Sequence, residues 1–277
     1  MHKLIAANGA RLRQYRVFWL TLGGVLLVSL VYMWNCSRTV AEMAAAGFVS
    51  PLEKSFFAMA PYMGVVYAAF ISLFLSAELA DGAVRNKLII GHTRRDVYLA
   101  DYLVCLGACL AFAGMWFLGG LPGLVWIGPF SMQAGEVLTW LLVAVGFTAA
   151  FTALFVLVSL LSDNKAAAVI LTLALWLGLV LAAGALYDRL QEPEMTGGVM
   201  YADGAFQEVA PEPNPLYLSG WARTACTWLL DLLPAGQALL MHGAEITAPA
   251  RQILCSLLLT GLVLWAGIRA FQRKEIK

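Results

Sequence analysis

The sequence has 277 residues, of which 61% are hydrophobic and 13% are charged, with a mean hydropathy of +0.77 and a formal net charge of +1. Soluble globular proteins carry roughly 45–50% apolar and about 25% charged residues, so this composition excludes an ordinary water-soluble domain and indicates a membrane protein. The balanced charge, without a basic run interleaved with aromatic residues, also excludes nucleic acid as a partner.

The first 16 residues form a basic leader to the apolar part of the chain. They read MHKLIAANGARLRQYR and mix Leu4, Ile5 and Leu12 with four Lys or Arg residues. Apolar and basic residues combined in this way are typical of a helix that lies in the membrane interface. We therefore predict an interfacial helix over residues 1–16 that leads into the first span, with a solvated basic tail as the alternative.

Six uncharged apolar stretches follow this leader. A membrane-spanning helix needs ~20 apolar residues, because a rise of about 1.5 Å per residue has to cross ~30 Å of hydrocarbon. We expect the first stretch to be a retained anchor rather than a cleaved signal, since its basic leader is 16 residues long. Pro122 is expected to break the third stretch near its outer end. The predicted spans are 17–33, 55–77, 102–128, 137–161, 166–187 and 252–268.

The segment between the second and third spans, Glu78 to Asp101, reads ELADGAVRNKLIIGHTRRDVYLAD. Asp81 is of a type that caps the start of a helix, and Gly91 is of the type that ends one in a left-handed conformation. These two residues predict a short helix over about 82–90. The helix would carry an apolar ridge on one side and polar residues around the rest: Val84, Leu88 and Ile89, and then Arg85, Asn86 and Lys87.

A second helix start follows directly. Thr93 and Asp96 form an S/T-x-x-acid capping box with Arg94 and Arg95 between them, which predicts a helix that runs into the third span. A short rigid helix at the membrane surface, with an apolar ridge and a charged flank, suits docking into a groove on a partner protein. The simpler alternative is a basic turn that enforces topology and touches lipid headgroups.

A long excursion, residues 188–250, separates the fifth and sixth spans. Its first part, 191–215, is rich in Pro, Gly and acidic residues and predicts a loop. Its second part, 221–241, is apolar but is interrupted by Asp231 and Pro234. This pattern predicts two short helices at or dipping into the outer interface rather than a seventh span.

Lys and Arg residues are distributed unevenly between the two sets of span ends. The ends that share a side with both termini hold 13 of them, and the opposite ends hold 5. Positive residues gather on the cytoplasmic side, so both termini are predicted to be cytoplasmic. The predicted fold is therefore one all-α integral membrane domain over 1–277 with six transmembrane helices, and the helical excursion 188–250 is extracellular.

Motifs for catalysis and metal binding are missing from the sequence. The five cysteines show no CxxC spacing and the three histidines are scattered, so we predict no metal site. A GxxxxGK[ST] phosphate loop, an HExxH and a GxSxG are also absent, which predicts no enzyme activity and no cofactor in this chain. Cys36 and Cys226 both fall on the predicted outer side, and a disulfide between them is a hypothesis.

The predicted spans hold no Asp, Glu, Lys, Arg or His away from their ends. Proton- or sodium-coupled carriers normally keep ionisable groups near mid-membrane to bind the driving ion. A transporter without such groups has to take its energy from elsewhere. A separate ATPase fits that gap.

Several runs of residues carry a resemblance to a known family. They are Glu78, Gly82, the run Arg85-Asn86-Lys87-Leu88-Ile89, Gly91, Arg94 and Tyr98-Leu99, and later NPLYLSG at 214–220 and LLDLLPAGQ at 229–237. Together with the six-span layout, they resemble the permease subunits of ABC exporters of the ABC-2 type. Ala83 departs from the pattern, since this family often has Thr there, and the acidic insertion at about 190–213 matches no family pattern.

The resemblance implies a membrane subunit of a larger transporter. Two permeases, either two copies of this chain or this chain and a homologous one, would pair in a bacterial plasma membrane. Each would dock on an ABC ATPase subunit, two copies in all, which hold the ATP and Mg. The segment between spans two and three would be the coupling helix that receives the movement of the ATPase. Its contact residues would be Glu78, Gly82, Arg85, Asn86, Lys87, Gly91, Arg94 and Arg95.

An apolar, uncharged set of spans favours a hydrophobic or amphipathic substrate, such as a lipid, a peptide or a drug. Two other classes stay open. An integral-membrane enzyme would need several polar residues that converge at the membrane surface. A non-transporting component, such as a sensor or an assembly factor, would need no ATPase. An ATPase that travels with this chain would favour the exporter.

Overall fold

The structure, a computed structural model, describes residues 1–202 and 205–274. Six helical segments in this part of the chain are long and apolar enough to cross a membrane, in agreement with the six predicted spans. Its elements are α1 (His2–Gln14), α2 (Arg16–Ala45), α3 (Leu52–Phe56), α4 (Ala60–Ala80), α5 (Ala83–Ile89), α6 (Arg94–Gly120), α7 (Gly123–Trp126), α8 (Ala134–Leu161), α9 (Lys165–Gln191), β1 (Met195–Ala202), β2 (Ala205–Pro213), α10 (Gly220–Leu232), α11 (Pro234–His242) and α12 (Pro249–Arg273).

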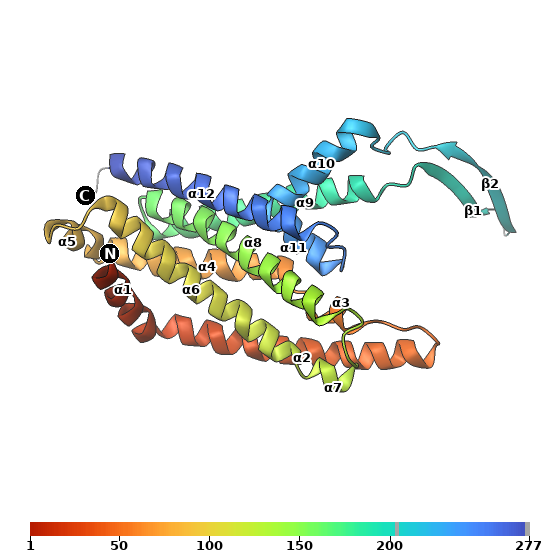
Figure 1. The fold of residues 1–277 in the computed structure, drawn as a ribbon, viewed down its shortest axis with the longest axis horizontal. Helices are drawn as coiled ribbons and strands as arrows, with labels where there is room; N and C mark the ends of the chain where they lie inside the picture. The colour runs from red at the N-terminus through yellow and green to blue at the C-terminus, as the bar shows by residue number, and fades with distance from the viewer. Residues whose placement is uncertain (203–204, 275–277) are drawn as a thin grey trace.

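The long helices run side by side in one bundle (Figure 1). Both chain termini, α5 and the turn between α8 and α9 lie at one end of the bundle, which we call the terminal end. The β1–β2 hairpin, α7 and the loop after α2 lie at the opposite end, which we call the distal end. Termini that share an end are what an even number of crossings requires.

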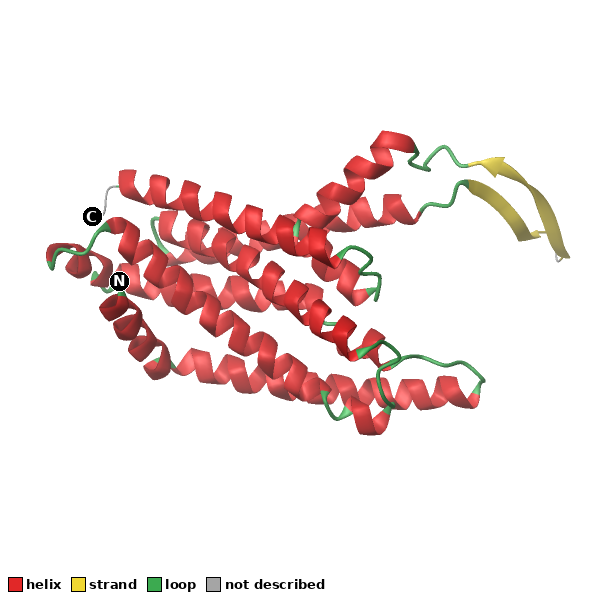
Figure 2. Ribbon diagram, in the orientation of Figure 1, coloured by secondary structure: helices red, strands yellow, loops and turns green. Residues whose placement is uncertain are grey.

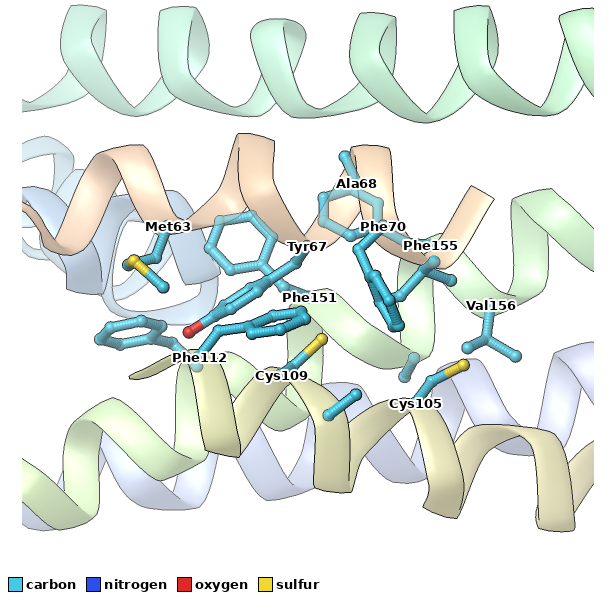
Figure 3. Close-up of a cluster of buried hydrophobic side chains, with 14 of the residues drawn as sticks. Met63, Tyr67, Ala68, Phe70, Cys105, Cys109, Phe112, Phe151, Phe155 and Val156 are labelled. Carbon is cyan, nitrogen blue, oxygen red and sulfur yellow. The ribbon is translucent and has the colours of Figure 1, made fainter. Parts of the chain in front are cut away.

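The centre of the bundle is an aromatic core built by α4, α6 and α8 (Figure 3). Phe70 of α4 and Phe112 of α6 meet edge to face, with ring centroids 4.9 Å apart. Tyr67 is fully buried beside them, and its hydroxyl oxygen lies 3.3 Å from Thr148 Oγ1 on α8. Lipid provides no hydrophobic drive between helices, so close packing and hydrogen bonds of this kind hold the three helices together.

A small residue lets α2 approach this core closely. A Cβ placed on Gly119 of α6 would lie 2.6 Å from Ser29 Cβ on α2, closer than such atoms approach one another. Across the same contact, the Ser29 hydroxyl donates to the Trp116 carbonyl oxygen at 2.7 Å. Glycine at position 119 therefore sets the distance between the first and third spanning helices.

The outward faces of α2, α9 and α12 are apolar. Leu27, Leu181 and Leu262 are each more than 60% exposed, and other large apolar residues surround them on the same helices. A soluble monomer rarely exposes apolar patches of this extent. Lipid chains are the solvent that suits these faces.

The predicted helix breaks are confirmed, and several spanning helices are longer than the predicted spans, α2 by the most. The leader forms α1, α6 ends two residues before Pro122, and α11 begins at Pro234 after a break in the chain direction. The predicted first span, 17–33, is only part of α2, which continues to Ala45. The prediction followed the uncharged run, whereas the backbone hydrogen bonds of the helix continue through the polar residues beyond it.

The loop predicted over 191–215 is wrong for most of its length. β1 and β2 pair there as an antiparallel hairpin that projects from the distal end (Figure 2). The backbone pairs run from Met195 with Pro213 to Ala202 with Ala205. The Pro and Gly content that suggested a loop is a local property, and it does not register pairing between two strands. The described chain is therefore mostly helical, which is compatible with the predicted all-α membrane class, and it carries one two-stranded hairpin that was not predicted.

The hypothesis of a disulfide between Cys36 and Cys226 is not met. Both residues are free thiols in the structure. Cys36 belongs to α2 and Cys226 to α10, and these two helices lie on opposite sides of the bundle (Figure 1). The pairing was suggested because both cysteines were predicted on the same side of the membrane. A disulfide also requires their Cα atoms to lie close together, which a shared side does not ensure.

Candidate functional site

Two glycines set the position of α5 at the terminal end. Gly82 precedes α5 with φ +66°, and Gly91 follows it with φ +99°, both in the left-handed region that favours glycine. Gly91 is therefore the left-handed residue that the sequence predicts. The predicted cap at Asp81 is wrong: the N-cap position is Gly82, without a side-chain cap. The sharp reversal after α4 requires a positive φ, which Asp81 does not supply.

Thr93 caps the start of α6 as predicted, but the other half of the predicted capping box differs, because Asp96 accepts from the Thr93 hydroxyl group instead of its backbone N–H. The Asp96 backbone N–H donates to Thr93 Oγ1 at 3.1 Å, and the Thr93 hydroxyl donates to Asp96 Oδ2 at 2.8 Å. The helix begins at the next residue, Arg94. The chain therefore enters the third span from a fixed point directly after α5.

The most unusual feature of this end is a buried carboxylate in the last turn of α4. Glu78 is 1% exposed, and two cations reach it from other helices. The Arg11 guanidinium comes from α1 and the Lys87 ammonium from α5, and both form ion pairs with Glu78. Arg11 Nη2 also donates to the Phe74 carbonyl oxygen at 3.0 Å.

A second buried carboxylate completes the arrangement. Asp101 of α6 is 0% exposed, and its Oδ1 accepts a hydrogen bond from Asn8 Nδ2 at 2.6 Å. Lys87 Nζ lies 3.6 Å from the same oxygen and donates to Asn8 Oδ1 at 2.8 Å. Two cations thus face two anions, which is the balance that buried charge needs. We call these residues the four-helix charge cluster: Asn8 and Arg11 of α1, Glu78 of α4, Lys87 of α5 and Asp101 of α6.

Aromatic rings border this cluster on the side of α1. The Arg11 guanidinium carbon lies 4.0 Å from the centroid of the Phe74 ring, and the Tyr15 ring lies 5.5 Å from the same ring. Burial raises the pKa of the Tyr15 phenol, and the charge of Arg11 opposes this with a smaller lowering. Tyr15 is thus a neutral neighbour of Arg11.

Arg94 connects the start of α6 to the end of α12. Its Nη1 donates to the Phe271 carbonyl oxygen at 2.9 Å and to the Lys274 carbonyl oxygen. The last carbonyl groups of a helix have no partner within the helix, so a cation placed there stabilises its end. The C-terminal end of the chain is therefore tied to the segment that follows α5.

The eight residues predicted to contact a partner fall into three groups. Three of them bind within the chain, as just described: Glu78, Lys87 and Arg94. Their charged groups are thus used within the chain, and their predicted place in or beside the partner contact stays a prediction. Gly82 acts through its backbone. The others are exposed: Arg85, Asn86, Gly91 and Arg95.

The predicted apolar ridge of α5 is divided in the same way. Val84 is 1% exposed and anchors α5 against the bundle. Ile89 and Ile90 point outward and are 71% and 78% exposed. We call the outward residues the α5 surface: Arg85, Asn86, Ile89, Ile90 and Arg95. Two neighbouring exposed isoleucines between arginines, on a rigidly held helix, form a surface that suits a protein partner.

Sequence reasoning missed three members of the charge cluster. Asn8 and Arg11 were assigned only to an amphipathic leader, and Asp101 was treated as a span end. The one available signal was spacing, since Asn8 and Arg11 lie one turn apart on a helix and share a face. Their partners lie 93 and 67 positions away in the sequence, which no local pattern connects.

A second polar cluster lies where α10, α11 and α12 meet. Asp231 is 1% exposed, and its carboxylate accepts from Arg251 Nε at 2.5 Å and from Gln252 Nε2 at 2.9 Å. Gln237 Nε2 donates to the Asp231 carbonyl oxygen at 2.6 Å, and Ser256 Oγ donates to Gln237 Oε1 at 2.9 Å. These contacts join the two short helices to the sixth span, so the cluster is a structural joint.

An apolar groove of about 310 Å³ opens on the side of the bundle between α2 and α4. Val28 of α2, Tyr62 of α4 and Trp116 of α6 are among the residues that line it. The lining is almost entirely apolar, which suits a hydrocarbon chain or another hydrophobic molecule.

Comparison with protein-family models gave no match for this chain, and a search of curated proteins gave no relative.

Proposed function

We propose that this chain is the membrane-spanning permease subunit of an ATP-driven exporter of the ABC-2 type. The observation that carries the proposal is the arrangement of α5. Its inner side is fixed to three other helices through Lys87, and its outer side presents Ile89 and Ile90. A helix fixed in this way transmits a push on its outer side to α1, α4 and α6 together, because buried ion pairs resist separation.

The terminal end would face the cytoplasm. It carries both termini, α5 and the α8–α9 turn, which together hold most of the Lys and Arg residues of the chain. A cytoplasmic ATPase subunit, holding ATP and Mg, would bind the α5 surface from that side. Two permeases would pair in the plasma membrane and bind one ATPase each.

The cargo would be hydrophobic or amphipathic. The groove between α2 and α4 supports this choice, because a molecule with an apolar part reaches it from the bilayer without crossing a polar region. The charge cluster would lie at the membrane surface and not at mid-membrane, which is where carriers driven by a proton or sodium gradient bind their coupling ion.

A purification from host membranes in mild detergent tests the proposal. We expect an ATPase with a phosphate loop to copurify with the wild-type chain and to hydrolyse ATP. The double variant Arg85→Glu/Arg95→Glu should lose this ATPase, because it reverses two exposed charges on the α5 surface without touching a buried group. The matched control is Lys165→Glu, an exposed charge reversal at the same end of the bundle, which should keep it.

Two results would contradict the proposal. One is that the intact wild-type protein is purified from host membranes and no ATPase copurifies with it. The other is equal ATPase recovery from the Arg85→Glu/Arg95→Glu variant and from Lys165→Glu. Unchanged elution on gel filtration has to accompany each variant, so that loss of the partner is distinguished from unfolding.

A further inference from the structure

The turn between α8 and α9 holds a groove that the proposed function does not use. The groove measures about 430 Å³. Leu157, Val158 and Leu161 of α8 line its body together with Leu171 of α9. Ser162, Asp163 and Asn164 line its mouth. One site thus combines an apolar body with a polar and charged opening.

Its position is the boundary between the membrane and water. The apolar lining belongs to the last turns of the fourth spanning helix and the first turns of the fifth, and the turn lies at the terminal end (Figure 1). Leu171 and its neighbour Ile170 are 51% and 64% exposed. In a bilayer, side chains so placed contact lipid near the headgroup level.

The mouth carries charges of both signs. The Asp163 side chain is 92% exposed, and the pair it forms with Lys274 is loose, with Nζ 3.5 Å from Oδ1. Lys274 already donates to the carbonyl oxygens of Leu160 and Ser162, at 3.2 and 2.7 Å. The carboxylate of Asp163 therefore keeps room for further hydrogen-bond donors.

Positive charge lies beside this carboxylate. Lys165 is exposed in the first turn of α9. Asn164 Oδ1 accepts from the Ala167 backbone N–H at 2.8 Å, while the other N–H groups of the first turn have no partner within the helix. The start of a 27-residue helix carries a partial positive charge that favours a phosphate.

We infer that this groove binds phosphatidylethanolamine from the leaflet at the terminal end. An acyl chain would lie along the leucines of the body. The phosphate would lie near Lys165 and the first turn of α9, and the primary ammonium would donate hydrogen bonds to Asp163. Phosphatidylcholine fits less well, because its quaternary ammonium has no N–H to donate. The inference depends on the chain spanning a membrane and not on the proposed function.

Photocrosslinking of the full chain in lipid nanodiscs tests the site. The nanodiscs contain phosphatidylcholine with a small fraction of phosphatidylethanolamine that carries a diazirine on one acyl chain. We expect the label on the peptide 157–171, and we expect unlabelled phosphatidylethanolamine to compete roughly two- to five-fold better than phosphatidylcholine, the range for one exposed ion pair. Asp163→Asn should remove that preference and leave labelling itself in place.

A matched pair of tryptophan substitutions tests the apolar body. Leu171→Trp should fill the groove and reduce labelling of 157–171 several-fold. Leu177→Trp, on an exposed position of the same helix, should leave it unchanged. Three results would overturn the inference: labels spread evenly over the outward leucines of α2, α9 and α12, equal competition by the two lipids, or a groove covered by a second copy of the chain, detected as a chain-to-chain crosslink from Leu171→Cys.

Discussion

Lys87 neutralises two buried carboxylates at once. Its ammonium pairs with Glu78 and lies 3.6 Å from Asp101 Oδ1, and it also donates to Asn8. A buried charge that loses its partner costs far more than an exposed pair contributes. The position of α5 therefore depends on Lys87, which the sequence pattern alone would predict to be a surface lysine.

Replacing Lys87 tests this balance. Lys87→Met should lower the free energy of unfolding by about 3–5 kcal/mol, because Asp101 is then buried without a cation. The double variant Lys87→Met/Asp101→Asn should be more stable than Lys87→Met alone, since the second change removes the unpaired charge. Loss of helicity during titration with denaturing detergent measures both. If the double variant is destabilised by the sum of the effects of Lys87→Met and Asp101→Asn measured singly, the charge balance between the two residues is contradicted.

At the scale of the element, α5 owes its position to backbone conformation as much as to charge. Gly91 has φ +99°, and among the described residues no atom beyond its two chain neighbours lies within 4 Å of the place where a Cβ would be. A substitution there meets open space, so its whole cost comes from the backbone. The two isoleucines just before this turn are held in their exposed positions by that conformation.

Gly91→Ala should destabilise the protein by about 1–2 kcal/mol, the cost of a left-handed conformation for an L residue. Gly114→Ala is the matched control, because Gly114 also has an open Cβ position but lies within α6 at an ordinary helical φ. The control should stabilise the protein by about 0.5–1 kcal/mol, since alanine favours a helix over glycine. Thermal unfolding in detergent compares the two variants. A Gly91→Ala variant as stable as wild type would show that the left-handed conformation at position 91 does not require glycine.

At the scale of the whole molecule, both termini and α5 lie at one end of a bundle with six helical segments long and apolar enough to cross a membrane, so six crossings would put them on the same side. In a variant without the native cysteines, a cysteine replacing Arg13 should react with a membrane-impermeant maleimide only after the cells are permeabilised. A cysteine replacing Val49, which is 95% exposed in the loop after α2, should react in intact cells. The opposite pattern would invert the topology, and reaction of both in intact cells would contradict a membrane crossing by α2, which lies between the two positions.

Local sequence patterns predicted the parts of this fold that local physics decides. Apolar runs marked the spans, Pro122 and Pro234 marked helix breaks, and the Thr93 cap marked the start of α6. The charge cluster could not be predicted in this way, because its members come from four helices and one of its hydrogen bonds joins residues 93 positions apart. The direction in which Lys87 points is decided by that packing.

The most direct test of the proposed function is a crosslink from the α5 surface. In a variant without the native cysteines, Ile90→Cys is treated with a bifunctional maleimide in inverted membrane vesicles from the host, and Val49→Cys, exposed at the distal end, is the control. The account predicts that Ile90→Cys forms a covalent product with an ATPase that carries a phosphate loop, and that Val49→Cys forms none. Two results would contradict the proposed function. One is a crosslinked product from both positions, and the other is an ATPase that copurifies with the chain but crosslinks to neither position.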